Sequence, residues 1–156
     1  MLGLAILSYN FTSNSNKEII YQSDGVLGEL KVVDRMLFNP KENKNKPYRE
    51  LMVNNISQTI MDRSNPEISY WDYVDLLTNN IQLYAKGKNT LLLGLGGGTL
   101  YKQLIKNKLH VDVVEIDQRI EEVAKKYFFI DDKLFMGVEY FLILFDLLLG
   151  FFTLEI

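Results

Sequence analysis

The middle of the chain alternates between short apolar runs and segments with helical periodicity. Residues 91–93 are all leucine, which predicts a buried strand covered on both faces. Apolar side chains then recur at positions 100, 101, 104 and 105, the spacing of one helical face. A second apolar strand is expected at residues 111–114 and ends in Glu115. This order predicts a βαβ unit.

One further helix is predicted on each side of this unit. The earlier helix follows Ser69 and Asp72, which are spaced as in a capping box, and Gly87 is a natural stop. Its apolar face consists of Val74, Leu77, Ile81 and Tyr84. The later helix follows Asp117, whose side chain can cap it. Its apolar face consists of Ile120, Val123, Ala124, Tyr127 and Phe128.

Three short strand candidates precede the first helix, at residues 25–34, 48–53 and 56–61. A polar loop, residues 39–47, separates the first two candidates. Asn54-Asn55 separates the last two and suits a two-residue hairpin turn, because Asn tolerates positive φ. The pattern therefore predicts a small antiparallel sheet ahead of the βαβ unit.

Two more strand candidates, residues 133–138 and 141–147, lie near the end of the chain. Almost no residues separate them, whereas a parallel crossover needs at least ~10. The apolar run 140–154 contains Asp146 and is shorter than the ~20 residues of a spanning helix, so a buried strand is favoured.

Together these elements predict an α/β fold, with an incomplete Rossmann-like (methyltransferase-like) parallel sheet preceded by a small antiparallel β-domain. Residues 1–20 are expected to form an apolar start and a polar linker, and residues 21–64 the β-domain. Residues 65–156 would form the Rossmann-like nucleoside-binding domain.

Composition excludes several classes of function. The chain has 156 residues, 47% of them hydrophobic and 24% charged, as in ordinary globular proteins. A net charge of −3 gives no electrostatic support for nucleic-acid binding. With no Cys and a single His, we expect no metal site, no disulfide and no thiol nucleophile. That histidine, His110, is expected in a loop.

The segment 94–98 reads Gly-Leu-Gly-Gly-Gly and joins the first predicted strand to its helix. Glycines let the backbone approach a ligand, and the helix N-terminus supplies free N–H groups. Glu115 follows Gly96 by 19 residues, close to the ~20 expected for an acid that binds ribose hydroxyls. A nucleotide or nucleoside site is therefore predicted. Thr99 departs from the dinucleotide pattern, so an S-adenosyl compound is an alternative, as are glycines that serve packing alone.

Five segments, in order, carry a resemblance to a known family. They are Gly-Glu-Leu-Lys-Val-Val-Asp at 28–34, Val-Asn-Asn-Ile-Ser-Gln-Thr at 53–59, Ser-Tyr-Trp-Asp at 69–72, Leu-Gly-Leu-Gly-Gly-Gly at 93–98 and Val-Val-Glu-Ile-Asp at 113–117. With them the chain resembles the spermidine synthase (polyamine aminopropyltransferase) family, in the version that follows a membrane domain in larger proteins. The likeness covers residues 21–128, with a weaker echo at 144–146.

The resemblance implies a role in polyamine biosynthesis, in which an aminopropyl group moves from decarboxylated S-adenosylmethionine to an amine such as putrescine. It assigns Gly94, Gly96 and Gly97 to the turn beside the nucleoside, and Glu115 to the ribose hydroxyls. Gln58 would reach the donor from the β-domain, and Tyr70 would line the substrate side of the active site. A solvated strand residue and a core aromatic are the alternative interpretations of Gln58 and Tyr70.

The transfer also needs a base, because an ammonium has no lone pair with which to attack. Asp146, at the carboxyl end of a predicted strand, is the candidate catalytic residue. We expect a co-substrate, decarboxylated S-adenosylmethionine or S-adenosylmethionine, rather than a permanently bound cofactor, with a small-molecule amine as partner. A cytoplasmic location is expected. A homo-oligomer and a membrane segment upstream of Met1 are left open.

Several departures from the family pattern argue against efficient transfer. The family has an acid at the position of Gly97 and a second acid at the position of Leu149. It has an adenine-side element near residues 137–139, and further strands and helices beyond the last residue of this chain. A shortened, weakly active or non-catalytic copy is therefore an alternative. An S-adenosylmethionine-dependent methyltransferase is another, since it shares the glycine turn and the ribose Glu.

Overall fold

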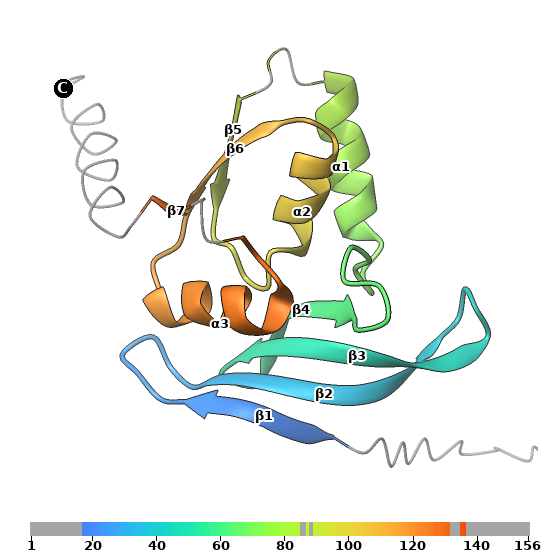
Figure 1. Cartoon of the computed structure of the whole chain (residues 1–156), viewed down its shortest axis with the longest axis vertical. Coiled ribbons are helices and arrows are strands. Elements are labelled where there is room, and N and C mark those ends of the chain that lie inside the picture. Colours follow the sequence, from blue (N-terminus) through green and yellow to red (C-terminus); the bar gives the residue numbers. More distant parts are fainter. Residues whose placement is uncertain (1–16, 85–86, 88, 132–134, 137–156) are drawn as a thin grey trace, which may run out of the picture.

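The computed structural model describes residues 17–84, 87, 89–131 and 135–136. Within them, an antiparallel sheet is followed by a parallel sheet with three helices (Figure 1). The elements are β1 (Glu18–Ser23), β2 (Leu30–Asn39), β3 (Lys44–Val53), β4 (Ile56–Asp62), α1 (Tyr73–Tyr84), β5 (Asn89–Leu93), α2 (Thr99–Lys106), β6 (His110–Val114), α3 (Gln118–Phe128) and β7 (Phe135–Met136). The predicted α/β class, with an antiparallel sheet ahead of the βαβ region, is confirmed.

The antiparallel sheet has the strand order β1-β2-β3-β4. The hairpin between β3 and β4 turns at Asn54 and Asn55, whose φ angles are 50° and 62°. Positive φ at both central residues is the geometry of a type I′ turn, so the predicted two-residue hairpin is confirmed.

The predicted polar loop at residues 39–47 is wrong for most of its length. Asn39 ends β2, and residues 44–47 belong to β3 and pair with residues 36–39 of β2. The polar residues suggest a loop, but Lys46 is polar and still lies in a strand. Its side chain is buried and pairs with the carboxylate of Asp62. An ion pair between β3 and the end of β4 thus compensates for a charged residue in a strand.

The strand β1 is not predicted by the hydrophobic pattern. It pairs antiparallel with β2 from Glu18 opposite Asp34, so the sheet begins ahead of residue 21. As an edge strand it leaves Ile19 half exposed, which weakens the alternation that would mark it. Its Tyr21 ring lies 5.7 Å from the ring of Tyr127 on α3.

The parallel sheet has the order β5-β6-β7, and α2 and α3 are its crossover helices. Both helices pack against the same side of β6, because residues of each share one buried cluster with Val111 and Val113. His110, expected in a loop, is the first residue of β6 and is exposed.

The burial predicted for β5 is wrong. Leu91 is 50% exposed and Leu93 is 68% exposed, whereas Leu92 is partly buried and packs against the core. The strand is therefore apolar on both faces but covered mainly on the face that carries Leu92. β5 occupies one edge of the described sheet, so β6 is its one described neighbour.

The helix α3 agrees with the predicted pattern, and α1 agrees in part. The carboxylate of Asp117 caps α3 by accepting the Arg119 N–H, at 3.0 Å. In α1, Val74 is buried as predicted, but Leu77 and Tyr84 are exposed. The predicted capping box is not formed. The Ser69 hydroxyl accepts the N–H of Trp71 instead, before the helix begins.

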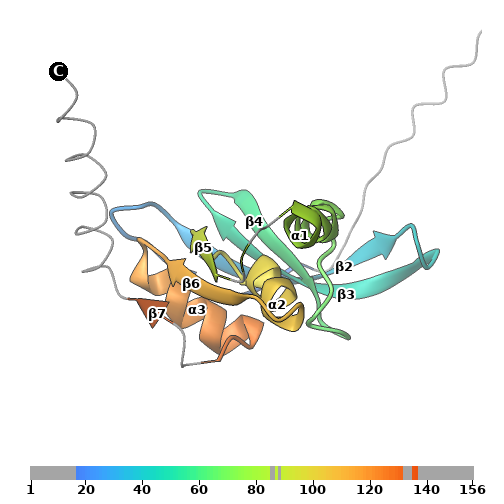
Figure 2. The same cartoon turned by 90° about the horizontal axis from the view of Figure 1, so that it is seen from above.

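The helix α3 lies between the two sheets (Figure 1), and in the view from above α2 lies between α3 and α1 (Figure 2). Val123 and Phe128 join the buried cluster of the antiparallel sheet, with Leu30, Leu51 and Met61. Ala124, on the same helix, belongs to the buried cluster of the parallel sheet. One helix therefore contributes to both cores and fixes the two sheets relative to each other.

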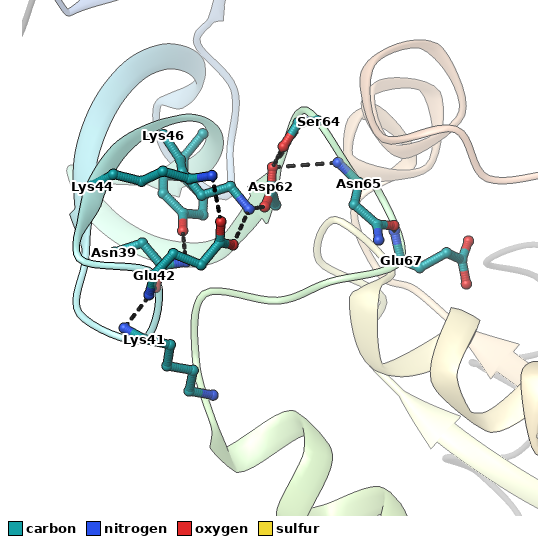
Figure 3. A network of polar contacts seen from close by, with 10 residues as sticks. Asn39, Lys41, Glu42, Lys44, Lys46, Asp62, Ser64, Asn65 and Glu67 are labelled. Atoms are coloured by element: carbon teal, nitrogen blue, oxygen red, sulfur yellow. Dashed lines mark hydrogen bonds and ion pairs between the residues drawn. The ribbon is translucent and has the colours of Figure 1, made fainter.

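A polar network fixes the chain where it leaves β4 for α1 (Figure 3). Asp62 is fully buried, and its Oδ1 accepts the N–H groups of Ser64 at 2.8 Å and Asn65 at 3.3 Å. Lys46 pairs with both Asp62 and Glu42. The network holds the hairpin of β2 and β3 beside the segment that precedes α1.

The strand candidate at residues 141–147, the catalytic candidate Asp146 and the first 16 residues lie outside the described residues. In the part of the chain that is described, no helix combines the length and the apolar character needed to cross a membrane.

We predict that Phe128→Ala lowers the free energy of unfolding by about 3–5 kcal/mol, because it leaves a cavity where α3 meets the antiparallel sheet. Urea denaturation followed by circular dichroism measures this. Phe38→Ala is the matched control. The Phe38 side chain is 48% exposed, so a loss of about 1 kcal/mol or less is expected. Equal losses in the two variants would contradict the role of α3.

Candidate functional site

A cavity of about 510 Å³ opens where β5 and β6 end. Several parts of the chain meet around it. The glycine turn after β5 provides the floor, and the residues after β6 provide one wall. The antiparallel sheet with its first loop contributes Leu27, Gln58 and Thr59, and each of the three helices contributes at least one further residue. The carboxyl ends of parallel strands are where α/β proteins commonly bind ligands.

The glycine turn needs its glycines for different reasons. Gly94 has a φ of +83°, but a Cβ there would meet nothing within 4 Å, so only the backbone conformation requires glycine. Gly96 has a φ of +55°, and a Cβ there would lie 3.0 Å from the Thr59 hydroxyl. Both residues line the cavity. At these positions the main chain itself forms the surface that a ligand would contact.

Gly97 faces away from the cavity lining. Its N–H donates to the Thr59 hydroxyl at 2.8 Å. A Cβ there would lie 2.7 Å from the Thr59 methyl and 2.8 Å from the Phe128 ring. The sequence predicts that these glycines either let a ligand approach or serve packing alone, and for Gly97 the packing interpretation applies. An acidic side chain at this position would have no room in this arrangement.

Glu115 binds the turn from the other side. Its side chain is buried, with Oε2 accepting the Leu95 N–H at 2.8 Å and Oε1 accepting the Asp117 N–H at 3.0 Å. Each carboxylate oxygen has a second lone pair. The carboxylate is thus held rigidly at the cavity wall and can still accept hydrogen bonds from two hydroxyls of a ligand.

Asp117 completes this wall, and Arg119 holds it from behind the lining. Asp117 caps α3 as predicted and also lines the cavity. Arg119 donates to Asp117 Oδ2 at 2.6 Å and to the carbonyl of Gly28 at 3.1 Å. The guanidinium therefore fastens the loop between β1 and β2, which carries Leu27, to the start of α3.

The predicted site residues are brought together in part. Gln58, Gly94, Gly96 and Glu115 all line the cavity, and Gly97 packs behind it. Tyr70 instead lines a separate cavity, where its ring packs edge-to-face on Tyr48 with centroids 5.1 Å apart.

Sequence reasoning missed Thr59, Leu27 and the cavity-facing position of Asp117. Thr59 directly follows Gln58 in one of the segments that resemble the family, which was the available signal. Tyr73, another omission, lines both cavities.

The charged residues among the described lining of the cavity are acidic. The described residues that line it include two carboxylates, Glu115 and Asp117, and no Lys, Arg or His. The remaining lining is largely apolar. Such a wall suits a ligand that is neutral or cationic, carries hydroxyl donors and has an apolar part. It lacks the cationic side chains that commonly pair with a pyrophosphate.

Comparison with known proteins gives a partial similarity. No family model matches the chain. A 62-residue stretch is 32% identical to the polyamine aminopropyltransferase of Vibrio vulnificus (strain CMCP6). The match covers 38% of this chain and 21% of that protein, so the chain matches about a fifth of the relative's length. The chain is therefore distantly and partially similar to a polyamine aminopropyltransferase.

We predict that Thr59→Val lowers the free energy of unfolding by about 1–3 kcal/mol, because it leaves the buried Gly97 N–H without its acceptor. Thermal and urea unfolding measure the loss. Thr78→Val is the matched control, since that buried hydroxyl only donates to the Val74 carbonyl of its own helix. If both variants lose the same amount, the hydrogen bond does not hold the turn.

A second prediction concerns pH. The Arg119 guanidinium, through its hydrogen bonds, lowers the pKa of Asp117. A carboxyl whose pKa falls on folding contributes stability above its unfolded pKa of ~3.9, and this contribution is lost as pH falls through the lower, folded value. Asp117→Asn should therefore be less stable than the wild type at pH 6, and the gap should narrow towards pH ~2.

Urea denaturation across this range measures the gap. Asn is also a good N-cap, so the difference in unfolding free energy reports the loss of the charge and not the loss of the helix cap. A gap for Asp117→Asn that stays constant down to pH ~2 would contradict the stabilisation of this carboxylate by Arg119.

Proposed function

We propose that this chain is an aminopropyltransferase-like domain whose cavity binds decarboxylated S-adenosylmethionine. The observation that carries the proposal is the position of Glu115. Its carboxylate lines the same cavity as Gly94 and Gly96, and it accepts the Leu95 N–H within the glycine turn. A rigid acid beside a close-approaching backbone is the arrangement that binds the sugar of a nucleoside.

The rest of the lining supports a nucleoside as the ligand. Ile116 is 53% exposed and follows Glu115 directly, so it offers an apolar surface beside the sugar position. Leu93 offers a second one. A purine ring placed there would be covered by apolar groups, while its ribose hydroxyls would reach the free lone pairs of the Glu115 carboxylate.

The charge of the lining favours the decarboxylated donor over S-adenosylmethionine. Both carry a sulfonium, but S-adenosylmethionine adds a carboxylate, and the described lining residues include two carboxylates and no cation. Like charges within one cavity oppose binding. This observation ranks the aminopropyltransferase interpretation above a methyltransferase, in line with the partial similarity to a polyamine aminopropyltransferase.

Transfer to an amine would require a base as well as a donor site. Both oxygens of Glu115 already accept backbone N–H groups, and Asp117 is paired with Arg119. Neither is therefore well placed to take a proton from an ammonium. We assign donor binding to the described cavity and keep Asp146 as the predicted base that would hold and deprotonate the acceptor amine.

Isothermal titration calorimetry with the two donors tests the proposal. We expect decarboxylated S-adenosylmethionine to bind more tightly than S-adenosylmethionine. The reverse preference would favour the methyltransferase alternative and contradict the charge argument. Binding of neither compound would contradict the proposal as a whole.

Two variants locate the binding. Glu115→Ala should weaken binding by at least ~1 kcal/mol, about fivefold, because charge-assisted hydrogen bonds are lost. Since this change also removes the Leu95 contact, Gln58→Ala accompanies it. The Gln58 side chain is exposed and makes one long contact to the Ile56 carbonyl, at 3.4 Å. Gln58→Ala should weaken binding roughly two- to tenfold with unchanged stability. Full affinity in both variants would place the ligand elsewhere.

A further inference from the structure

Another cavity, of about 310 Å³, lies between α2 and the residues that follow α3. We call it the lysine cavity, because Lys102 of α2 lines it. Ile105, Phe129 and Ile130 give its lining an apolar part. It shares no described lining residue with the cavity proposed for the nucleoside. Chemistry in the lysine cavity is therefore independent of the proposed function.

The Lys102 amine is buried without an acidic partner. Its side chain is 9% exposed, and it forms no ion pair within the described part of the chain. Its Nζ donates to the Pro66 carbonyl at 3.1 Å and, more weakly, to the Met61 sulfur at 3.9 Å. An ammonium has three N–H donors, whereas a neutral amine has two donors and a lone pair. Two acceptors therefore satisfy the neutral form and leave its lone pair free.

Lys46 shows the opposite arrangement at the same burial. It is also 9% exposed, but its ammonium pairs with Asp62 and Glu42, which raise its pKa. Burial instead lowers the pKa of Lys102, and the carboxylate of Glu67, at the same cavity, offsets that effect only in part. At neutral pH a larger share of Lys102 than of an ordinary exposed lysine is therefore the neutral, nucleophilic amine.

The lysine cavity also has a proton donor. Three further titratable residues line it, Tyr101 and Lys106 from α2 and Asp131 from the segment after α3. Tyr101 is 4% exposed, and its hydroxyl has no hydrogen-bond partner among the described residues. Burial raises the pKa of Tyr101, and Asp131 adds to that effect, so the hydroxyl stays protonated at neutral pH. A nucleophile and an unused proton donor thus belong to one lining.

We propose that the lysine cavity is a covalent site for a small apolar aldehyde, which condenses with the Lys102 amine to form an imine.

The condensation needs no further reagent. The lone pair of the amine attacks the carbonyl carbon, and a carbinolamine forms. A C=N double bond then replaces the C=O bond, and the oxygen leaves as water with the two hydrogens of the amine. This oxygen must be protonated before it leaves. The Tyr101 hydroxyl is the candidate donor, and it recovers its proton from the nitrogen.

The lining favours a neutral ligand over a charged one. An anion would meet the carboxylates of Glu67 and Asp131, and a cation would meet Lys106. A neutral, apolar body instead lies against the Phe129 ring, whose centroid is 5.8 Å from the Lys102 Nζ. The volume is at the lower end of the range for small-molecule cavities, which limits the size of the aldehyde.

Reductive labelling of the wild-type full chain tests the proposal. Benzaldehyde is added at about pH 7 with sodium cyanoborohydride, which reduces each imine to a stable secondary amine, and peptide mass spectrometry follows each lysine over time. We expect Lys102 to be labelled at least about fivefold faster than Lys106, which lines the same cavity but is exposed. Lys46 should be labelled more slowly than both. Labelling of Lys102 no faster than that of Lys106 would overturn the proposal.

Glu67→Gln tests whether the neutral amine is the reacting form. The Glu67 side chain is exposed, and removing its charge lowers the pKa of Lys102 further, because the carboxylate stabilises the ammonium. Labelling of Lys102 at about pH 7 should become roughly two- to threefold faster. Glu122→Gln is the matched control, since it removes the same charge from an exposed position on α3 that does not line the cavity. An unchanged rate in Glu67→Gln, or an equal gain in both variants, would overturn this part of the proposal.

Tyr101→Phe tests the proton donor. The change keeps the buried ring and removes a hydroxyl that has no partner among the described residues, so the fold should be retained. Labelling of Lys102 should become at least about threefold slower, while that of Lys106 stays the same. An unchanged rate at Lys102 would overturn the role of Tyr101.

Discussion

One buried carboxylate, that of Glu115, holds the candidate site together. Glu115 accepts the N–H of Leu95, in the glycine turn, and the N–H of Asp117, just before α3. A buried carboxylate is costly unless its oxygens are hydrogen-bonded, and here two backbone donors satisfy it. The same two bonds set the position of the turn relative to the end of β6. The cavity floor and its acidic wall are therefore fixed by a single side chain.

The antiparallel sheet gives this arrangement its second support. Thr59, on β4, accepts the Gly97 N–H, and Phe128 of α3 packs over the same glycine. The turn is thus held between Glu115 on one side and Thr59 on the other. Arg119 extends the connection to the carbonyl of Gly28, in the first loop of the sheet. The antiparallel sheet therefore forms a wall of the candidate site and also lies next to the parallel sheet.

The elements that the sequence predicts well are those whose cause is local. The apolar face of α3, the cap at Asp117 and the Asn54-Asn55 turn each follow from a few adjacent residues. The position of Glu115 is also predictable locally, because it directly follows a strand and so lies at the carboxyl edge of the sheet. The lining positions of Gly94 and Gly96 depend on the same strand ends.

The elements that sequence reasoning missed depend on distant partners. Nothing near Thr59 indicates that it bonds a glycine 38 residues later. The exposure of Leu93 depends on what covers the far face of β5, and the location of Tyr70 depends on its packing against Tyr48. Lys46 reads as a loop residue until Asp62 is placed beside it. Tertiary pairing, rather than periodicity, decides each of these cases.

The most direct test of the central claim follows the backbone amides themselves. In ¹H–¹⁵N spectra of the full chain titrated with decarboxylated S-adenosylmethionine, the amides of Leu95, Gly96 and Asp117 should shift most, because they border the Glu115 carboxylate and the cavity floor. The amides of the β2–β3 hairpin should stay unchanged. Shifts confined to other parts of the chain, or none at saturating nucleoside, would contradict the account.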